Sequence, residues 1–467
     1  MAYYNPIAVN QTASGQVAPG LAVYDDTAAA STFSSSSMET STTGVIDDQP
    51  LVCTMGVRTN STQMFPPDGL CEYLFYDSLY IMGRNTFAPR DQFDVHLKTF
   101  VEIASSYKTT SFGVGFTYSS AYHLEAYLLQ QATKKFNVMK NFWDHSIYHI
   151  GVVDSATVNP TEAELIPALI LRDNFSQEIV NQGIKVFTFF AANIPDAGWA
   201  RFYIRNFTNV IMPDVYIALG HYSRGDNGLP SCRAVPPTLL QKPQGAEDSY
   251  QYDLTTAAES IVRLSGLGLK SVLSVSLKGH LALLTDPDKR GFLAPCMTNN
   301  SLDSFASYAE YIREEVARQL SLVATINGTP TTLDHSLRRA IQRQVAEALP
   351  SPASPISVAA PLTFAEAVRR PPAQPPLPSY SPATNYYRSP VSVYPLCKIK
   401  EQHIDTKFGI AVFDIDYADF SNACRSRGGP FARLHLLRSI LNFFRTRYRS
   451  AADMKDCMQL AYQAMVG

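Results

Sequence analysis

The stretch FGIAVFDIDYADFSNAC (residues 408–424) combines an apolar run with a cluster of acidic residues. Residues 409–415 have the composition of a buried strand. Asp414, Asp416 and Asp419 crowd its C-terminal end. A strand that ends in carboxylates and leads into a helix is typical of the last βα unit of an α/β barrel, where function lies at the strand C-termini. The expected helix follows Pro430, with apolar residues at helical spacing: Leu434, Leu437, Ile440, Leu441 and Phe444.

Seven further apolar runs precede this stretch and are separated by helix-length intervals. Such a pattern predicts a parallel sheet covered by helices. Eight strands is the number that closes a (β/α)8 TIM-type barrel, and an open doubly wound sheet is the alternative. Helical patterns are expected over 122–142 and 161–171. The seven strands are predicted at 50–56, 69–77, 111–118, 147–154, 184–191, 215–220 and 271–277.

Two segments fall outside the barrel pattern. Residues 1–49 are rich in Ser, Thr, Ala and Gly without periodicity, which predicts a disordered N-terminal arm. Residues 326–393 combine a short amphipathic helix with a Pro-rich stretch and are interpreted as a disordered insertion before the last strand. Barrel strands one to seven then occupy 50–325, and the last strand with the C-terminal helices occupies 394–467. Within the insertion, FAEAVRRPP (364–372) resembles the spacer of retroelement capsid-type polyproteins.

Net charge, apolar runs and sequons limit the classes of partner and the cellular compartment that are expected. The 467 residues carry a formal net charge of -2, which offers no electrostatic case for nucleic acid. The longest apolar runs fall short of a membrane span. No Lys or Arg precedes Arg58, so a signal peptide is not expected in this chain. N-x-S/T sequons nevertheless favour an extracellular location, with candidate glycosylation sites at Asn60, Asn174, Asn206 and Asn299.

In their order and spacing, the predicted strands resemble the family 18 glycoside hydrolases, the chitinases and chitinase-like lectins. The resemblance covers about residues 50–320 and 394–450. The chain is also similar to divergent tick members of the family that lack the catalytic signature. It implies a disulfide between Cys53 and Cys71, another between Cys424 and Cys457, and an oxidising compartment. The motifs that carry it are LVC (51–53), FPPDGLC (65–71), SVSLKGHLALL (274–284), SYAEYI (307–312) and the stretch 409–424.

The catalytic signature of that family, D-x-x-D-x-D-x-E at the end of strand four, is missing. The resemblance places HIGVVDSA (149–156) at this position. If Asp154 takes the last Asp position, Ala156 replaces the general acid. The loss of general acid catalysis removes a factor of about 10²–10⁴ in rate, so no useful hydrolysis is expected. If Asp154 instead takes the acid position, the three supporting aspartates are replaced by Ile147, Ile150 and Val152.

A catalytically inactive chitinase-like barrel that binds a chitin-like or other glycan, or a protein, is therefore the first hypothesis. One alternative is a divergent hydrolase with a relocated site at Asp154, Asp414, Asp416 and Tyr222. Another is an interaction protein that acts through its disordered segments. His149 is interpreted as a core histidine, and no metal or cofactor is expected. Each ligand-binding candidate also has a purely structural reading as a core or hydrogen-bonding residue: Phe413, Asp154, Tyr118, His221 and Tyr222.

Overall fold

A computed structural model describes the part of the chain that forms the barrel. These residues belong to one compact unit, which begins at Ile46. The described residues are 47–79, 92–117, 135–154, 160–163, 165–166, 168–169, 179–181, 183–221, 233–234, 236–242, 252–283, 285–286, 293–296, 304–306, 384–387, 393–420, 422 and 429–466.

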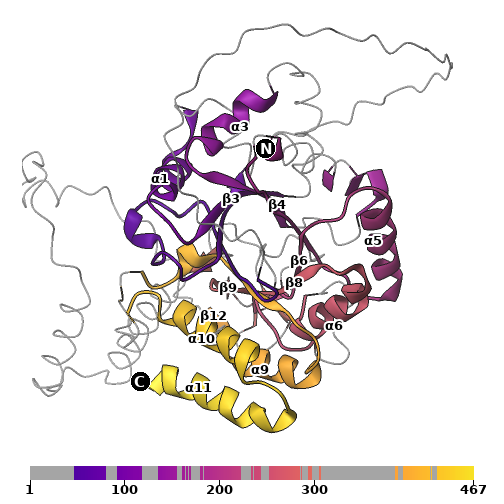
Figure 1. Cartoon of the computed structure of the whole chain (residues 1–467). Helices are drawn as coiled ribbons and strands as arrows, with labels where there is room; N and C mark the ends of the chain where they lie inside the picture. Colours follow the sequence, from indigo (N-terminus) through magenta and orange to yellow (C-terminus); the bar gives the residue numbers. More distant parts are fainter. Residues whose placement is uncertain are drawn as a thin grey trace, which may run out of the picture. The chain divides into compact units, whose positions relative to one another are not determined.

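Eight parallel strands close into a barrel, which confirms the predicted fold class (Figure 1). The strand from the opening stretch, β13, pairs with both β1 and β8 and thereby closes the sheet. Each of the eight predicted runs overlaps a barrel strand. The strands, in barrel order, are β1 (Leu51–Met55), β13 (Gly409–Phe413), β8 (Lys270–Ser276), β6 (Val215–Ala218), β5 (Thr188–Ala192), β4 (Ile147–Asp154), β3 (Ser111–Thr117) and β2 (Tyr73–Leu79).

Alternate residues of the strands form two separate apolar layers. One row faces the barrel axis and fills the interior with Phe75, Phe189, Phe413 and smaller side chains. The other row packs outward against the helices. At Gly115, an added Cβ would lie 2.3 Å from Val153, so close packing inside the barrel requires glycine there. The interior is therefore a packed core rather than a channel.

Helices cover the outside of the barrel (Figure 1). Three of them begin at an aspartate whose carboxylate accepts a hydrogen bond from a backbone amide of the first turn, namely Asp94, Asp196 and Asp253. No described helix is long and apolar enough to cross a membrane. The described helices are α1 (Val95–Ala104), α3 (Lys135–Trp143), α5 (Ala197–Asn209), α6 (Leu254–Leu264), α9 (Val393–Gln402), α10 (Ala432–Thr446) and α11 (Met454–Val466).

Part of the expected Pro-rich insertion is a strand. β12 (Thr384–Tyr387) pairs antiparallel with β9 (Gly279–Leu283), which also pairs with β11 (Ser304–Ala306). The segment expected to be a disordered insertion through residue 393 thus includes a paired strand at 384–387. TNYY is too short to stand out in a Pro-rich context, and its pairing partner lies about 100 residues earlier. A two-stranded sheet, β7 (Arg233–Ala234) with β10 (Ala294–Pro295), completes the described strands.

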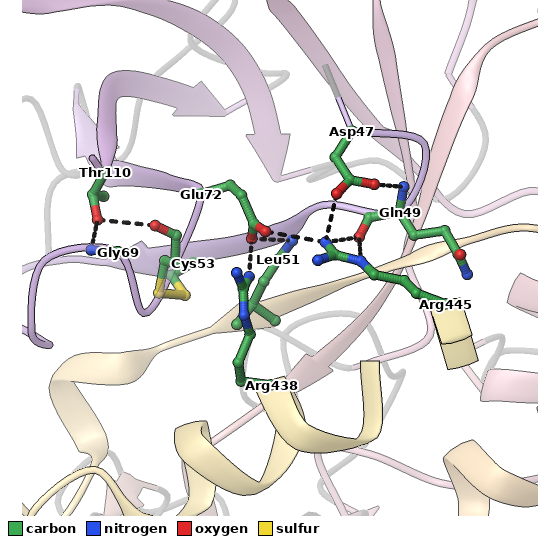
Figure 2. Close-up of polar contacts among 10 residues, drawn as sticks. Asp47, Gln49, Leu51, Cys53, Gly69, Glu72, Thr110, Arg438 and Arg445 are labelled. Carbon is green, nitrogen blue, oxygen red and sulfur yellow. Dashed lines mark hydrogen bonds and ion pairs between the residues drawn. A yellow bond between two sulfur atoms is a disulfide. The ribbon is translucent and has the colours of Figure 1, made fainter. Parts of the chain in front are cut away.

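Charged residues tie the N-terminal end of the barrel together (Figure 2). Glu72, just before β2, accepts hydrogen bonds from the Leu51 amide at 2.8 Å and from Arg445 at 3.0 Å. Arg438 also pairs with Glu72. Arg445 additionally contacts the chain before β1, through Asp47. These contacts fix α10 against the end of the barrel opposite to the one where the strand C-termini meet.

The disulfides agree with one expectation and overturn the other. Cys53 is bonded to Cys71, as the family resemblance implies. Cys457, by contrast, is bonded to Cys397 rather than to Cys424. The reason is that α9 and α11 pack side by side and bring these two sulfur atoms together. Cys424 lies outside the described residues.

Candidate functional site: the mouth at the strand C-termini

Polar side chains from three adjacent strands meet at the C-terminal end of the barrel, which we call the mouth. On β1, the Thr54 hydroxyl donates to Asp77 of β2 at 2.6 Å. The same hydroxyl accepts from the backbone amide of Asp414, just after β13, at 3.3 Å. A continuous hydrogen-bonded chain thus links β2, β1 and β13. Each of these residues lies near the C-terminal end of its strand, where the functional sites of barrel proteins are built.

Asp414 is the centre of this polar layer. Its backbone is left-handed, with φ of 60°, a conformation that aspartate tolerates better than most residues. Its carboxylate accepts from the Ser276 hydroxyl at 2.5 Å and from the Lys278 ammonium at 3.2 Å. The side chains of Lys278 and Asp414 are 6% and 15% exposed, respectively. A lysine so deeply buried needs a paired carboxylate, and Asp414 supplies it.

Asp416 lies below the surface of the mouth. It is buried, and its carboxylate accepts from the Arg58 amide at 3.2 Å. Burial, with the nearby negative charge of Asp414 as a second cause, raises the pKa of Asp416 to about 6. The side chain holds the loop after β1 next to the turn after β13. Asp414 and Asp416 are therefore both engaged in contacts within the protein.

Phe413 and His221 pack on each other instead of lining an open surface. Their ring centroids are 4.3 Å apart, and both side chains are buried. The His221 Nδ1 atom lies 2.7 Å from the Ser274 hydroxyl, which also accepts from the Gly220 amide. The face of Phe413 that could stack on a sugar is thus covered by His221 in this structure.

The packing of β4 shows which of its residues face the interior. Val152 and Ile150, which the alignments place at signature positions, pack in the outer layer against the helices. The row that faces the interior is His149, Gly151 and Val153. The pairing of β4 with β3 shifts twice, which breaks simple alternation along the strand. Among the residues of β4 whose side chains are described, the inward row has no carboxylate.

His149 is a core residue, as the sequence interpretation has it. Its Nδ1 atom accepts from the Phe187 amide at 3.1 Å, and its ring contacts those of Tyr73 and Phe187. Burial lowers the pKa of His149 to about 3, so the imidazole is neutral in the folded protein near neutral pH.

Several predicted site residues cannot be placed. Tyr118 and Tyr222 lie outside the described residues, as do Asn174 and Asn299. Asp154 ends β4, and its side chain is not described. Asn60 is exposed and remains a candidate for glycosylation. Asn206 is buried in α5, where its amide donates to the Phe202 carbonyl, and this burial contradicts the expectation of a glycan there.

Sequence reasoning missed Thr54, Asp77, Ser276 and Lys278. They were available as polar residues at or near the ends of apolar strands, which is the signal that identified Asp414. The family pattern obscured them, because it directs attention to strand four. Among the described residues, no group of three or more His, Cys, Asp or Glu side chains could hold a metal ion.

Comparison with known proteins supports the fold. No protein-family model matches the sequence, and no curated protein matches it. YKL-39, solved in the presence of chitooligosaccharides, is 13% identical, with 84% of this chain and 99% of that chain covered and a TM-score of 0.50. Human YKL-39, described as a pseudo-chitinase with retained chitooligosaccharide binding, is 12% identical with the same coverage and a TM-score of 0.49.

Catalytic domain 2 of a Group II chitinase from the insect Ostrinia furnacalis gives a similar result. It is 10% identical, with 85% of this chain and 96% of that chain covered and a TM-score of 0.48. The chain thus has a fold similar to that of YKL-39. At identities this low, the likeness concerns the fold and does not extend to activity.

Proposed function

We propose that the protein is a catalytically inactive chitinase-like barrel that binds a glycan at its mouth. The observation that carries the proposal is the inward row of β4, where His149, Gly151 and Val153 stand on the strand that should present the catalytic carboxylates. In family 18 hydrolases the substrate's N-acetyl group acts as the nucleophile, and a carboxylic acid at the end of strand four protonates the glycosidic oxygen. Asp414 is held by Ser276 and Lys278, so it does not replace the missing acid.

The binding part of the proposal rests on the chemistry of the mouth. Carboxylate, ammonium and hydroxyl groups lie within hydrogen-bonding distance of one another at the C-terminal ends of β1, β8 and β13. Such groups both donate to and accept from sugar hydroxyls. YKL-39 is described as retaining chitooligosaccharide binding without being a chitinase. We carry that ligand class over to this chain as a proposal.

Isothermal titration with N-acetylglucosamine oligomers of two to six units tests the binding part. The proposal predicts saturable binding that strengthens with oligomer length. No binding of the hexamer at millimolar concentration would refute the glycan part. An interaction protein would then be the better account, and deletion of 326–383 should abolish partner binding with little change in melting temperature. That deletion leaves β12 in place.

The relocated hydrolase is the second candidate, and Asp416 gives it a specific observation. A carboxyl group with a pKa near 6 is suited to general acid catalysis. Its burial and its backbone hydrogen bond favour a structural role instead. Cleavage of a chitin oligomer that is lost in Asp416→Asn would support the hydrolase.

A further inference from the structure

Two N-x-S/T sequons lie within the described residues, and their asparagines differ in exposure. The first is NST (60–62), in the loop after β1, and the second is NFT (206–208), in the last turn of α5. An N-linked oligosaccharide is bulky and hydrophilic, so the asparagine that carries it must present its side-chain nitrogen to solvent. The two sites can be compared on that requirement.

Asn60 meets the requirement. It is exposed, and its side-chain amide donates to none of the described residues. Its backbone is held in place, because the Asn60 amide donates to the Met64 sulfur atom at 3.5 Å. The next residue, Ser61, is extended, and its side chain caps the short 3₁₀ helix Thr62–Met64. A sugar on Asn60 would project into solvent without breaking any of these contacts.

Asn206 does not meet the requirement. It is 4% exposed, and its side-chain amide donates to the Phe202 carbonyl at 2.9 Å, one turn earlier in α5. A sugar on this nitrogen would enter the layer where α5 packs, and a close-packed interior has no room for it. Transfer of the oligosaccharide acts on the chain before it has folded. A chain modified at Asn206 would therefore fail to reach this fold.

The disulfides indicate a compartment in which such a transfer takes place. Cys53 is bonded to Cys71, and Cys397 to Cys457. Disulfides form and persist in oxidising environments, of which the lumen of the endoplasmic reticulum is one. The Cys53–Cys71 bond also closes the loop that contains the first sequon.

We propose that Asn60 carries an N-linked glycan and that Asn206 does not. In the transfer, the Asn60 Nδ2 atom attacks the anomeric carbon of an oligosaccharide that is carried on a lipid pyrophosphate. A bond forms between Nδ2 and that carbon while the bond from the carbon to the pyrophosphate oxygen breaks. The lipid pyrophosphate leaves, and the amide nitrogen releases one proton. This modification does not depend on glycan binding at the mouth.

The test expresses the full chain in the secretory pathway of human cells and treats its peptides with peptide N-glycosidase in heavy-oxygen water. The enzyme converts a glycosylated asparagine into labelled aspartate, which mass spectrometry assigns to its residue. The wild type should be labelled at Asn60 and unlabelled at Asn206. Thr62→Ala destroys the first sequon and should abolish the label at Asn60. A label that persists in this variant would come from spontaneous deamidation and would overturn the proposal.

Ser61→Ala is the matched control, because it removes the cap of the same 3₁₀ helix but leaves a sequon, N-A-T. It should keep the label. An unlabelled Asn60 in secreted protein that contains the Cys53–Cys71 bond overturns the proposal, and so does a label at Asn206. Recovery of Cys53 and Cys71 as free thiols would overturn it as well, because the chain would then not mature in an oxidising compartment.

Discussion

The stability of the barrel should depend on two buried groups whose pKa values are shifted in opposite directions. His149 is neutral in the folded state, with its pKa lowered to about 3 by burial from an ordinary value of 6.5. Between these values the unfolded chain binds a proton that the folded chain does not. Stability therefore falls as pH decreases, by roughly 1.4 kcal/mol per pH unit once the pH is well below 6.5.

Asp416 acts in the opposite sense. Its pKa is raised to about 6 from 3.8, so between these values the folded chain holds a proton that the unfolded chain has lost. Its contribution is fully present below pH 3.8 and is lost as pH rises through 6. Over pH 4–6 the two groups thus largely cancel in the wild type.

Removing Asp416 should therefore expose the effect of His149. In Asp416→Asn, we expect the free energy of unfolding to fall by about 2 kcal/mol between pH 6.5 and pH 4.5, relative to a variant that also carries His149→Gln. Gln is neutral throughout this range and can still accept from the Phe187 amide. Urea unfolding followed by circular dichroism at pH 6.5, 5.5 and 4.5 measures the difference. A difference below about 1 kcal/mol over this range would refute the burial of a neutral His149.

Three further predictions concern the framework of the barrel. Glu72→Gln should lower the free energy of unfolding by about 2 kcal/mol in urea melts, because Arg438 and Arg445 lose their shared carboxylate. The control Glu162→Gln, in an exposed ion pair, should change it by less than about 1 kcal/mol. Equal effects of the two substitutions would contradict the stabilising role of Glu72. Gly115→Ala should cost about 1–3 kcal/mol by overpacking, and adding Val153→Ala should restore part of that loss if the clash is the cause. Replacing both Cys397 and Cys457 by Ser should cost up to about 4 kcal/mol, from the loop of 60 residues that their bond closes, and an unchanged melting temperature would exclude a stabilising disulfide.

Strand composition was sufficient to predict eight buried parallel strands, and it left an open doubly wound sheet as the alternative to the closed barrel. Each strand is a short apolar run because parallel strands are buried on both faces, and this signal does not depend on tertiary detail. The closing strand could be predicted for the same reason, since residues 409–413 combine that composition with a turn rich in aspartate. The disulfide between Cys53 and Cys71 followed from a resemblance to a family and not from the residues alone.

The remaining features depend on geometry that sequence patterns do not encode. The inward row of β4 is set by shifts in strand pairing, and a shift of one residue exchanges the inward and outward rows. The pair of Lys278 and Asp414 joins residues 136 apart in the sequence. The partner of Cys457 was mistaken because it depends on how α9 packs against α11. For the same reason, the strand Thr384–Tyr387 is apparent only beside β9.

The central claim is that this barrel binds a glycan without cleaving it. The most direct test incubates the wild type and Asp154→Asn with an N-acetylglucosamine hexamer, at a protein concentration that saturates binding, and follows the oligomer by mass spectrometry. We predict that the hexamer binds and stays intact with both proteins over many hours. Release of shorter oligomers by the wild type would contradict the claim, and release that persists in Asp154→Asn would also place the active site away from the end of β4.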